Sequence, residues 1–184
     1  MFNTYIQFLR ELLCPIKGIS LNTTEKAIIA KISPKLLEFR KNFTILTKIP
    51  VSVILDDLSK VLGYGEGSTP LSDDVFLGMV ATIYSLESDV EKEFEILSKI
   101  PFERFTTSKS SQLCRDFVKR NFPHEIESYL KLIRSDLSNS STRVHFKQEI
   151  NKICNIGGSS GKFFLFGSFW ELCLREFGGS FDKF

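Results

Sequence analysis

Residues 71–86, LSDDVFLGMVATIYSL, are apolar on nearly every face that a helix would present. Such a helix is normally enclosed by its own protein, because each apolar face that meets water costs free energy. A second segment, Lys162 to Phe177, has the same character. The two segments therefore predict two buried helices at the centre of the fold.

The segments around these two have the one-sided apolar spacing of amphipathic helices. Residues 2–13 carry such a stripe, and a proline at a first helical position, after Ser33 as N-cap, predicts a new helix at Pro34 that runs to about Leu46. Further helices are predicted after Thr24, after Pro50, and over residues 88–99, 108–120, 124–134 and 143–154. Strand signals are confined to residues 16–21 and 45–47. We therefore predict the mainly α class, as a single-domain helical bundle over residues 1–184.

Composition and charge exclude several classes of protein. The chain has 184 residues, of which 42% are apolar and 25% charged, and this is the composition of a globular domain. A formal net charge of +2 argues against a nucleic-acid binder, which needs a dense basic surface. No uncharged apolar run approaches the ~20 residues of a membrane span, and the first residues lack a basic signal-peptide region. We expect a cytoplasmic protein without nucleic-acid or membrane partners.

The cysteines and histidines narrow the chemistry further. Cys14, Cys114, Cys154 and Cys173 lie far apart and form no Cys-x-x-Cys pair, which disfavours a zinc knuckle or a redox motif. Free thiols are the simpler interpretation. With only two histidines in the chain, a metal site built on several histidines is excluded.

The first buried segment is entered through a glycine-rich turn at residues 63–70. Glycines at alternate positions, 63, 65 and 67, allow positive φ angles and a close approach of the backbone. Thr69-Pro70 is a typical start of a helix, and a turn of this kind presents free N–H groups that favour an anionic ligand. The turn lacks the Gly-Lys-Ser/Thr of a Walker A loop, and no strand precedes it as in a Rossmann turn.

Asp73 and Asp74 follow in the first turns of that helix and admit two interpretations. As structural residues they stabilise the helix dipole, by ~0.3–1 kcal/mol each. As site residues they hold a divalent cation such as magnesium, or they hydrogen-bond a polar substrate whose anionic end meets the turn. The sequence pattern alone leaves both open.

A second glycine-rich turn, at residues 155–162, opens the other buried segment with Ser159, Ser160 and Lys162. A third polar cluster, residues 104–108, precedes another helix. Because both glycine turns open buried helices, we expect them to come together in one pocket. The predicted pocket contains Gly65, Gly67, Thr69, Asp73, Asp74, Ser159 and Ser160, with Arg104 and Thr107 at its rim.

A family resemblance rests on these residues. The pattern Gly-x-Gly-x-Gly-x-Thr-Pro-x-x-Asp-Asp, followed by Gly78, resembles a domain-of-unknown-function family that includes the AllH-type subunit associated with oxamate carbamoyltransferase of allantoin breakdown. Thr106-Thr107, Ser110, the 156–161 turn and Gly167 extend the resemblance, which covers about residues 55–177. Gly158 and Phe163 depart from it, since the family usually has histidine and aspartate there.

The resemblance implies two alternatives for function. In the first, the chain is an enzyme subunit whose pocket takes a small anionic metabolite such as carbamoyl phosphate or a carboxylate, with Asp73 or Asp74 orienting the substrate or a metal. In the second, the chain is a non-catalytic partner or ligand-binding subunit of a multi-subunit enzyme. The departures at Gly158 and Phe163 favour the second, and the sequence offers no nucleophile beside an evident base.

Overall fold

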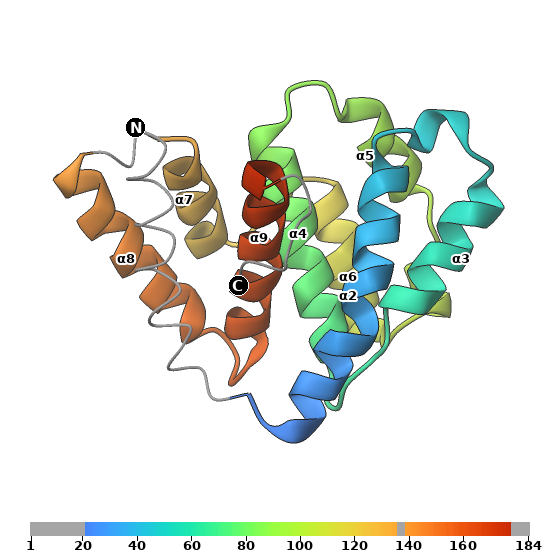
Figure 1. Cartoon of the computed structure of the whole chain (residues 1–184), viewed down its shortest axis with the longest axis horizontal. Helices are drawn as coiled ribbons and strands as arrows, with labels where there is room; N and C mark the ends of the chain where they lie inside the picture. Colours follow the sequence, from blue (N-terminus) through green and yellow to red (C-terminus); the bar gives the residue numbers. More distant parts are fainter. Residues whose placement is uncertain (1–20, 136–138, 178–184) are drawn as a thin grey trace.

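A computed structural model describes residues 21–135 and 139–177 of the chain (Figure 1). These residues form α-helices joined by turns, with two short 3₁₀-helices. The elements in chain order are α2 (Thr23–Phe43), η1 (Leu46–Lys48), α3 (Val51–Val61), α4 (Leu71–Leu86), α5 (Glu91–Ser98), η2 (Phe102–Arg104), α6 (Ser108–Val118), α7 (His124–Ile133), α8 (Ser140–Cys154) and α9 (Ser160–Phe177).

The mainly α prediction is confirmed, since the described residues contain eight α-helices and no strand. Where residues 45–47 were predicted as a short strand, the chain instead forms the 3₁₀-helix η1. The predicted helix at 2–13 and the strand at 16–21 lie outside the described residues. Among the described helices, none combines the length and the hydropathy that a bilayer span requires.

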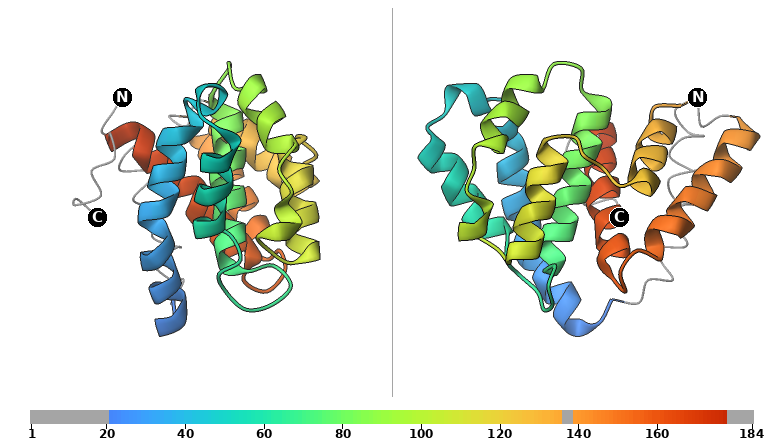
Figure 2. Two further views of the ribbon diagram at one scale, coloured as in Figure 1. Left: turned by 90° about the vertical axis from the view of Figure 1, so that its right-hand side faces the viewer. Right: turned by 180° about the vertical axis from the view of Figure 1, so that it is seen from behind.

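Helices α4 and α9 lie side by side at the centre of the bundle, as Figure 1 and the right-hand view of Figure 2 show. They run parallel: Thr69, before α4, contacts Ser160 at the start of α9, and Glu87, after α4, contacts Arg175 in the last turn of α9. The two helices that the sequence predicts to be buried are therefore each other's main packing partner.

The close approach of α4 and α9 requires glycine at the crossing point. A Cβ atom on Gly78 would lie 1.8 Å from the backbone oxygen of Phe164, and one on Gly167 would lie 1.8 Å from that of Val75. One turn further along, Thr82 and Ser168 share a hydrogen bond of 2.6 Å between the same two helices. The pair is thus held both by backbone contact and by a buried polar link.

Helix α2 corrects one expectation: a helix was predicted after Thr24 and a separate one from Pro34, but a single helix continues through Pro34. Asn22 and Glu25 form a complete capping box, so the helix begins at Thr23, eleven residues before Pro34. The buried side chains of α2 keep helical spacing on both sides of the proline; they are Ile32, Leu36, Phe39 and Phe43. Packing of this stripe against the core outweighs the loss of one backbone hydrogen bond at the proline.

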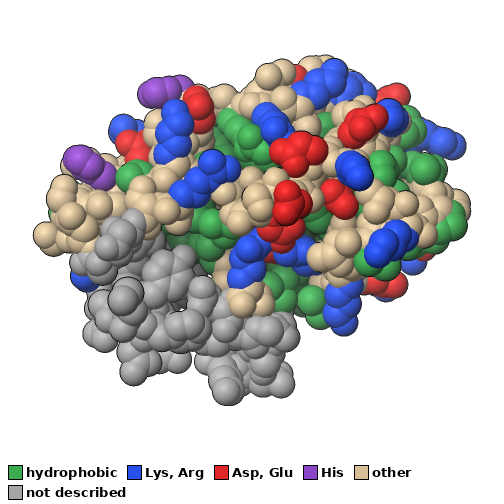
Figure 3. Space-filling view, turned by 90° about the horizontal axis from the view of Figure 1, so that it is seen from above, with side chains coloured by type: hydrophobic (Ala, Val, Ile, Leu, Met, Phe, Trp, Pro, Cys, Tyr) green, Lys and Arg blue, Asp and Glu red, His purple; other side chains and the backbone are tan. Residues whose placement is uncertain are grey.

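Helices α2, α4, α6 and α9 all begin at the same end of the molecule, the lower end in Figure 1. At the opposite end, the buried carboxylate of Glu171 accepts hydrogen bonds from Arg40 at 2.8 and 2.9 Å and from Arg175 at 3.0 Å. Acidic and basic side chains gather in the middle of this face when it is seen from above (Figure 3). At the lower end in Figure 1, by contrast, the N-terminal ends of α2, α4, α6 and α9 converge with their partial positive charge, and this end holds both glycine-rich turns.

Candidate functional site

The two glycine-rich turns meet at the N-terminal ends of α4 and α9. The hydroxyls of Thr69 and Ser160 lie 2.9 Å apart and share a hydrogen bond. The first turn folds back tightly onto α4, because Gly65 has φ +125° and a Cβ there would lie 2.6 Å from the backbone nitrogen of Leu71. The structure thus places residues 63–70 and 157–161 on one face of the core.

Asp73 is completely buried, and both oxygens of its carboxylate are occupied by protein donors. One oxygen accepts from the backbone N–H of Gly63 at 2.7 Å and from the hydroxyl of Ser72 at 3.2 Å. The other accepts from Ser110 at 2.6 Å and from Thr106. Asp73 therefore ties the first glycine turn and the start of α6 to α4, which is a structural role.

Asp74 lies beside it in a different environment. Only 5% of its surface is exposed, and burial raises the pKa of its carboxyl to about 7, with the negative charge of Asp73 adding to the rise. A hydrogen bond from Ser160 and the positive charge of Lys109 oppose that rise. Near neutral pH, Asp74 is thus present in both its protonated and its charged form, as is typical of a proton-transfer or ligand-binding residue.

A cavity of about 420 Å³ opens directly at Asp74. Its polar wall comes from the starts of α4, α6 and α9, where Thr69, Asp74, Lys109 and Ser160 lie. Apolar side chains make up most of the rest of its lining, and Glu125 contributes from the first turn of α7. The apolar members of the lining are Leu77, Leu113, Phe117, Pro123, Ile126, Ile153, Ile156 and Phe164.

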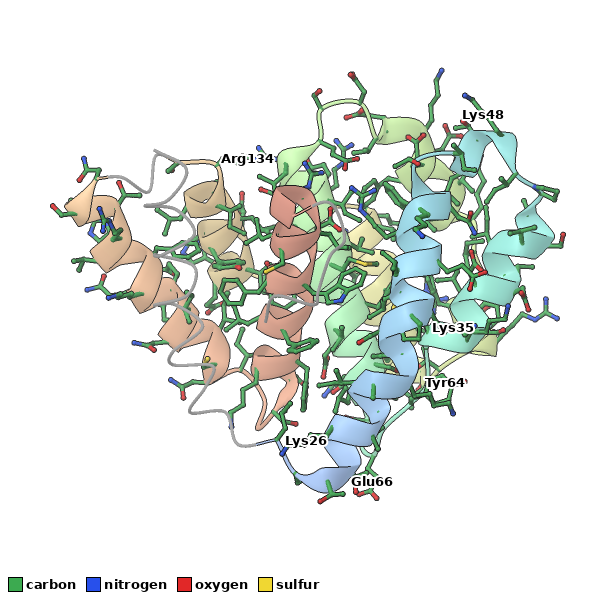
Figure 4. The ribbon with its side chains drawn as sticks, viewed as in Figure 1. Lys26, Lys35, Lys48, Tyr64, Glu66 and Arg134 are labelled. Carbon is green, nitrogen blue, oxygen red and sulfur yellow. The ribbon has the colours of Figure 1, made fainter. Side chains whose placement is uncertain are left out.

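A second cavity, of about 220 Å³, lies on the other side of Thr69. Gly65 and Ser159 line this cavity together with Asn22 and Glu25 from the start of α2. Figure 4 shows Glu66 beside the first turns of α2, with Tyr64 a little further along that helix. Of the predicted pocket residues, the structure thus places Thr69, Asp74 and Ser160 at the first cavity, and Gly65, Ser159 and again Thr69 at the second.

The remaining predicted residues lie outside both cavities. Gly67 is exposed at the tip of its turn. Thr107 caps α6 and donates a hydrogen bond of 2.6 Å to the backbone oxygen of Ser68, which holds the turn against α6. Arg104 is exposed in η2 and lines neither of the two cavities.

The backbone N–H groups at the start of α9 are not open to a ligand. The N–H groups of residues 160–163 all bond to carbonyl oxygens of residues 156, 157 and 159. An anion at this turn would therefore not be held by the N–H groups of residues 160–163.

The aspartate pair does not form a metal cage. Within the described residues, no group of three or more His, Cys, Asp or Glu side chains is arranged to hold a metal ion. The carboxylate oxygens of Asp73 already accept four hydrogen bonds, and this leaves Asp74 as the one carboxylate of the pair that faces the cavity. Magnesium bound here would depend on a single protein carboxylate and on oxygens from the ligand.

Sequence reasoning missed Lys109, the cation at the polar end of the cavity, and the apolar wall. The sequence position of Lys109 could have pointed to it. Lys109 follows Thr106 by three residues and lies at the start of α6, which hydrogen bonds to Asp73 tie to α4. The cysteines near the site are not reactive, since burial raises the pKa of the Cys114 thiol far above neutral pH. The chemistry of this end therefore depends on Asp74, Lys109 and two hydroxyls.

Comparison with known proteins identifies a family. A family model described as oxamate carbamoyltransferase subunit AllH matches residues 61–172, which is more than half of the chain. The matched range includes both glycine-rich turns, the two aspartates and Lys109. No curated protein and no solved structure matches the chain.

Proposed function

Because the chain belongs to the AllH family of oxamate carbamoyltransferase subunits, we propose that it works as a subunit of a carbamoyltransferase-type enzyme. In this proposal it has protein partners, and the cavity at Asp74 binds a small metabolite with a carbamoyl, carboxylate or phosphate group. Carbamoyl phosphate and oxamate are the compounds of this class that the family description suggests.

One observation carries the proposal: a buried carboxyl with a pKa of about 7 lines a cavity together with Thr69, Ser160 and Lys109. These groups suit a planar amide beside an anionic group. Asp74 in its charged form accepts from an amide N–H, and in its protonated form it donates to an oxygen. Lys109 and the N-terminal ends of α4, α6 and α9 favour the negative charge.

The same groups suggest a part in carbamoyl transfer. The nitrogen of oxamate attacks the carbamoyl carbon, the bond from that carbon to the phosphate oxygen breaks, and phosphate leaves. Asp74 would accept the proton that the attacking nitrogen loses, because its raised pKa makes it a better base than an exposed aspartate. Lys109 would balance the charge of the departing phosphate.

Titration calorimetry with oxamate and with carbamoyl phosphate tests the ligand part of this proposal. Ser160→Ala removes a hydroxyl of the polar wall and should weaken binding about tenfold, which corresponds to one lost hydrogen bond to a charged or polar group. Ser59→Ala is the matched control, since Ser59 is exposed on α3 and bonds only to the backbone oxygen of Asp56. Equal affinities in all three proteins would refute the site.

A second candidate function is a non-catalytic subunit, favoured by two residues of the second turn. Gly158 offers no side chain where the resemblance leads us to expect histidine, and Phe163 is buried where we expect aspartate. If those groups react in other members, this chain retains the pocket without part of the chemistry.

Phosphate release distinguishes the two candidates. The isolated chain is supplied with carbamoyl phosphate and oxamate, and phosphate is measured with and without Asp74→Asn. Turnover that Asp74→Asn abolishes supports a catalytic subunit. Binding of either compound without turnover supports a ligand-binding subunit.

A further inference from the structure

The cavity at Asp74 is divided into a polar end and an apolar end, and the division follows the direction of three helices. The polar residues come from the starts of α4, α6 and α9. One turn further along, each of these helices presents an apolar side chain on the same face: Leu77 after Asp74, Leu113 after Lys109, and Phe164 after Ser160. Phe117 extends the apolar wall by another turn of α6.

Helices α4, α6 and α9 run in parallel, so the change from polar to apolar side chains falls at the same level in all three. Ser110 at the start of α6 bonds to Asp73 at the start of α4, and the guanidinium of Arg120 lies 4.3 Å from the ring centre of Tyr84 near the ends of both helices. Helix α9 is parallel to α4 through the contacts described above. The apolar residues therefore form a continuous wall that leads away from Asp74, and Ile126 and Ile153 close it from α7 and α8.

The size of the cavity also exceeds what a head group needs. About 420 Å³ falls within the range of sites that enclose whole cofactors and drug-sized ligands. Oxamate and carbamoyl phosphate are polar throughout, and neither has a group that would cover the apolar wall. A ligand confined to Thr69, Asp74 and Ser160 would leave the part of that wall which is open to the cavity, as at Leu113, in contact with water, at a cost in free energy.

We propose that this cavity takes an amphiphilic metabolite, with its carbamoyl or carboxylate head at Thr69, Asp74 and Ser160 and an apolar body along Leu77, Leu113 and Phe164. The inference rests on the proposed function, because it assigns the head group to the same site. It adds the substrate class: an amide or carboxylic acid that bears an alkyl or aromatic group, in place of oxamate itself.

A series of N-alkyl oxamates tests this directly. Oxamate and its N-methyl, N-butyl and N-hexyl derivatives are titrated into the full chain by calorimetry. We expect the dissociation constant to fall by up to about fourfold for each methylene group that enters the apolar wall, the factor that corresponds to ~0.8 kcal/mol per buried methylene. The gain should stop when the alkyl chain reaches the end of the cavity.

Two variants locate the binding. Leu113→Trp, at a half-buried position of the wall, should fill the apolar end and abolish the gain with chain length while oxamate still binds. Leu132→Trp is the matched control, because Leu132 is also half-buried but does not line this cavity. If the tryptophan variant fails to fold, Leu113→Ala should reduce the gain in the same direction.

The outcomes separate this inference from the proposed function. Oxamate that binds with no gain along the series overturns the amphiphilic ligand and leaves the proposed function standing. A series in which no member binds overturns the inference, and it overturns the proposed function as well if carbamoyl phosphate also fails to bind. A gain with chain length that Leu113→Trp removes and Leu132→Trp retains supports the inference.

Discussion

Thr69 and Ser160 are 91 residues apart in the sequence, yet their hydroxyls lie 2.9 Å from each other. This hydrogen bond joins the two glycine-rich turns at the point where α4 and α9 begin. Thr69 lines the cavities on both of its sides, so the bond also forms part of the partition between them. The site thus depends on the parallel packing of the two central helices.

Asp73→Asn should destabilise the protein strongly. An asparagine has one acceptor oxygen where the carboxylate has two, and its NH₂ group would face the hydroxyls of Thr106 and Ser110 or the N–H of Gly63. We expect the free energy of unfolding to fall by about 2 kcal/mol or more, as for other buried hydrogen bonds to a charged group. Urea denaturation measures this. The control Asp56→Asn, on the exposed side of α3, should change it by less than ~0.5 kcal/mol.

Asp74 should make stability fall as the pH rises. Its folded-state pKa of about 7 lies above the ordinary value of 3.8, so the native state holds the proton more tightly than the unfolded chain does. The stabilisation is fully present below about pH 4 and is lost as the pH rises to about 7. Asp74→Asn removes this dependence. Melting temperatures of both proteins are measured between pH 4 and pH 8, and the melting temperature of the variant should rise relative to that of the wild type as the pH increases. A difference in melting temperature that stays constant over this range would contradict the raised pKa.

Gly78→Ala should separate the two central helices. The added Cβ would meet the backbone oxygen of Phe164, which cannot rotate away as a side chain can. We expect a loss of about 2–3 kcal/mol, typical of overpacking in a core, and a lower melting temperature. Ser141→Ala, at an exposed position of α8, provides the comparison and should melt close to the wild type. An unchanged stability in Gly78→Ala would show that α4 and α9 are further apart than the structure places them.

Arg40→Met should lower the free energy of unfolding, because it removes one partner of the buried carboxylate of Glu171. The side chain of Glu171 has no exposed surface, and burial raises the pKa of its carboxyl while Arg40 opposes the rise. Removing one partner of a buried pair typically costs about 3–5 kcal/mol, and the remaining contact with Arg175 should bring the loss towards the lower end. Urea denaturation of Lys35→Met, a change on the same helix at a side chain that is 43% exposed, is the control. A loss no larger than that of the control would mean that Arg175 alone compensates Glu171.

The central helices could be predicted closely from the sequence. Residues 71–86 were expected to form one helix and α4 spans Leu71–Leu86, while 162–177 became Ser160–Phe177. Their apolar character on all faces is a property of the segment itself, so it needs no knowledge of distant residues. The separate helix predicted to start at Pro34 was wrong for the opposite reason: Pro34 is a local signal, and the packing of Ile32 and Leu36 on either side of it overrides that signal.

The different environments of Asp73 and Asp74 could not be predicted. The two carboxylates are adjacent in the sequence, and their difference comes from partners far along the chain. Asp73 meets Ser110, 37 residues away, whereas Asp74 faces a cavity closed by α7, α8 and α9. Lys109 and the apolar wall escaped notice for the same reason, because only the parallel packing of α6 with α4 brings them to the site.

The binding of oxamate and carbamoyl phosphate to Asp74→Asn tests the central claim most directly. Calorimetric titration at pH 7 compares the wild type with this variant, whose folding is checked beforehand by its melting curve. The account predicts a variant that is at least as stable as the wild type at this pH and binds the better of the two ligands at least tenfold more weakly. A folded variant with the affinity of the wild type would contradict it and would make Asp74, like Asp73, a structural residue.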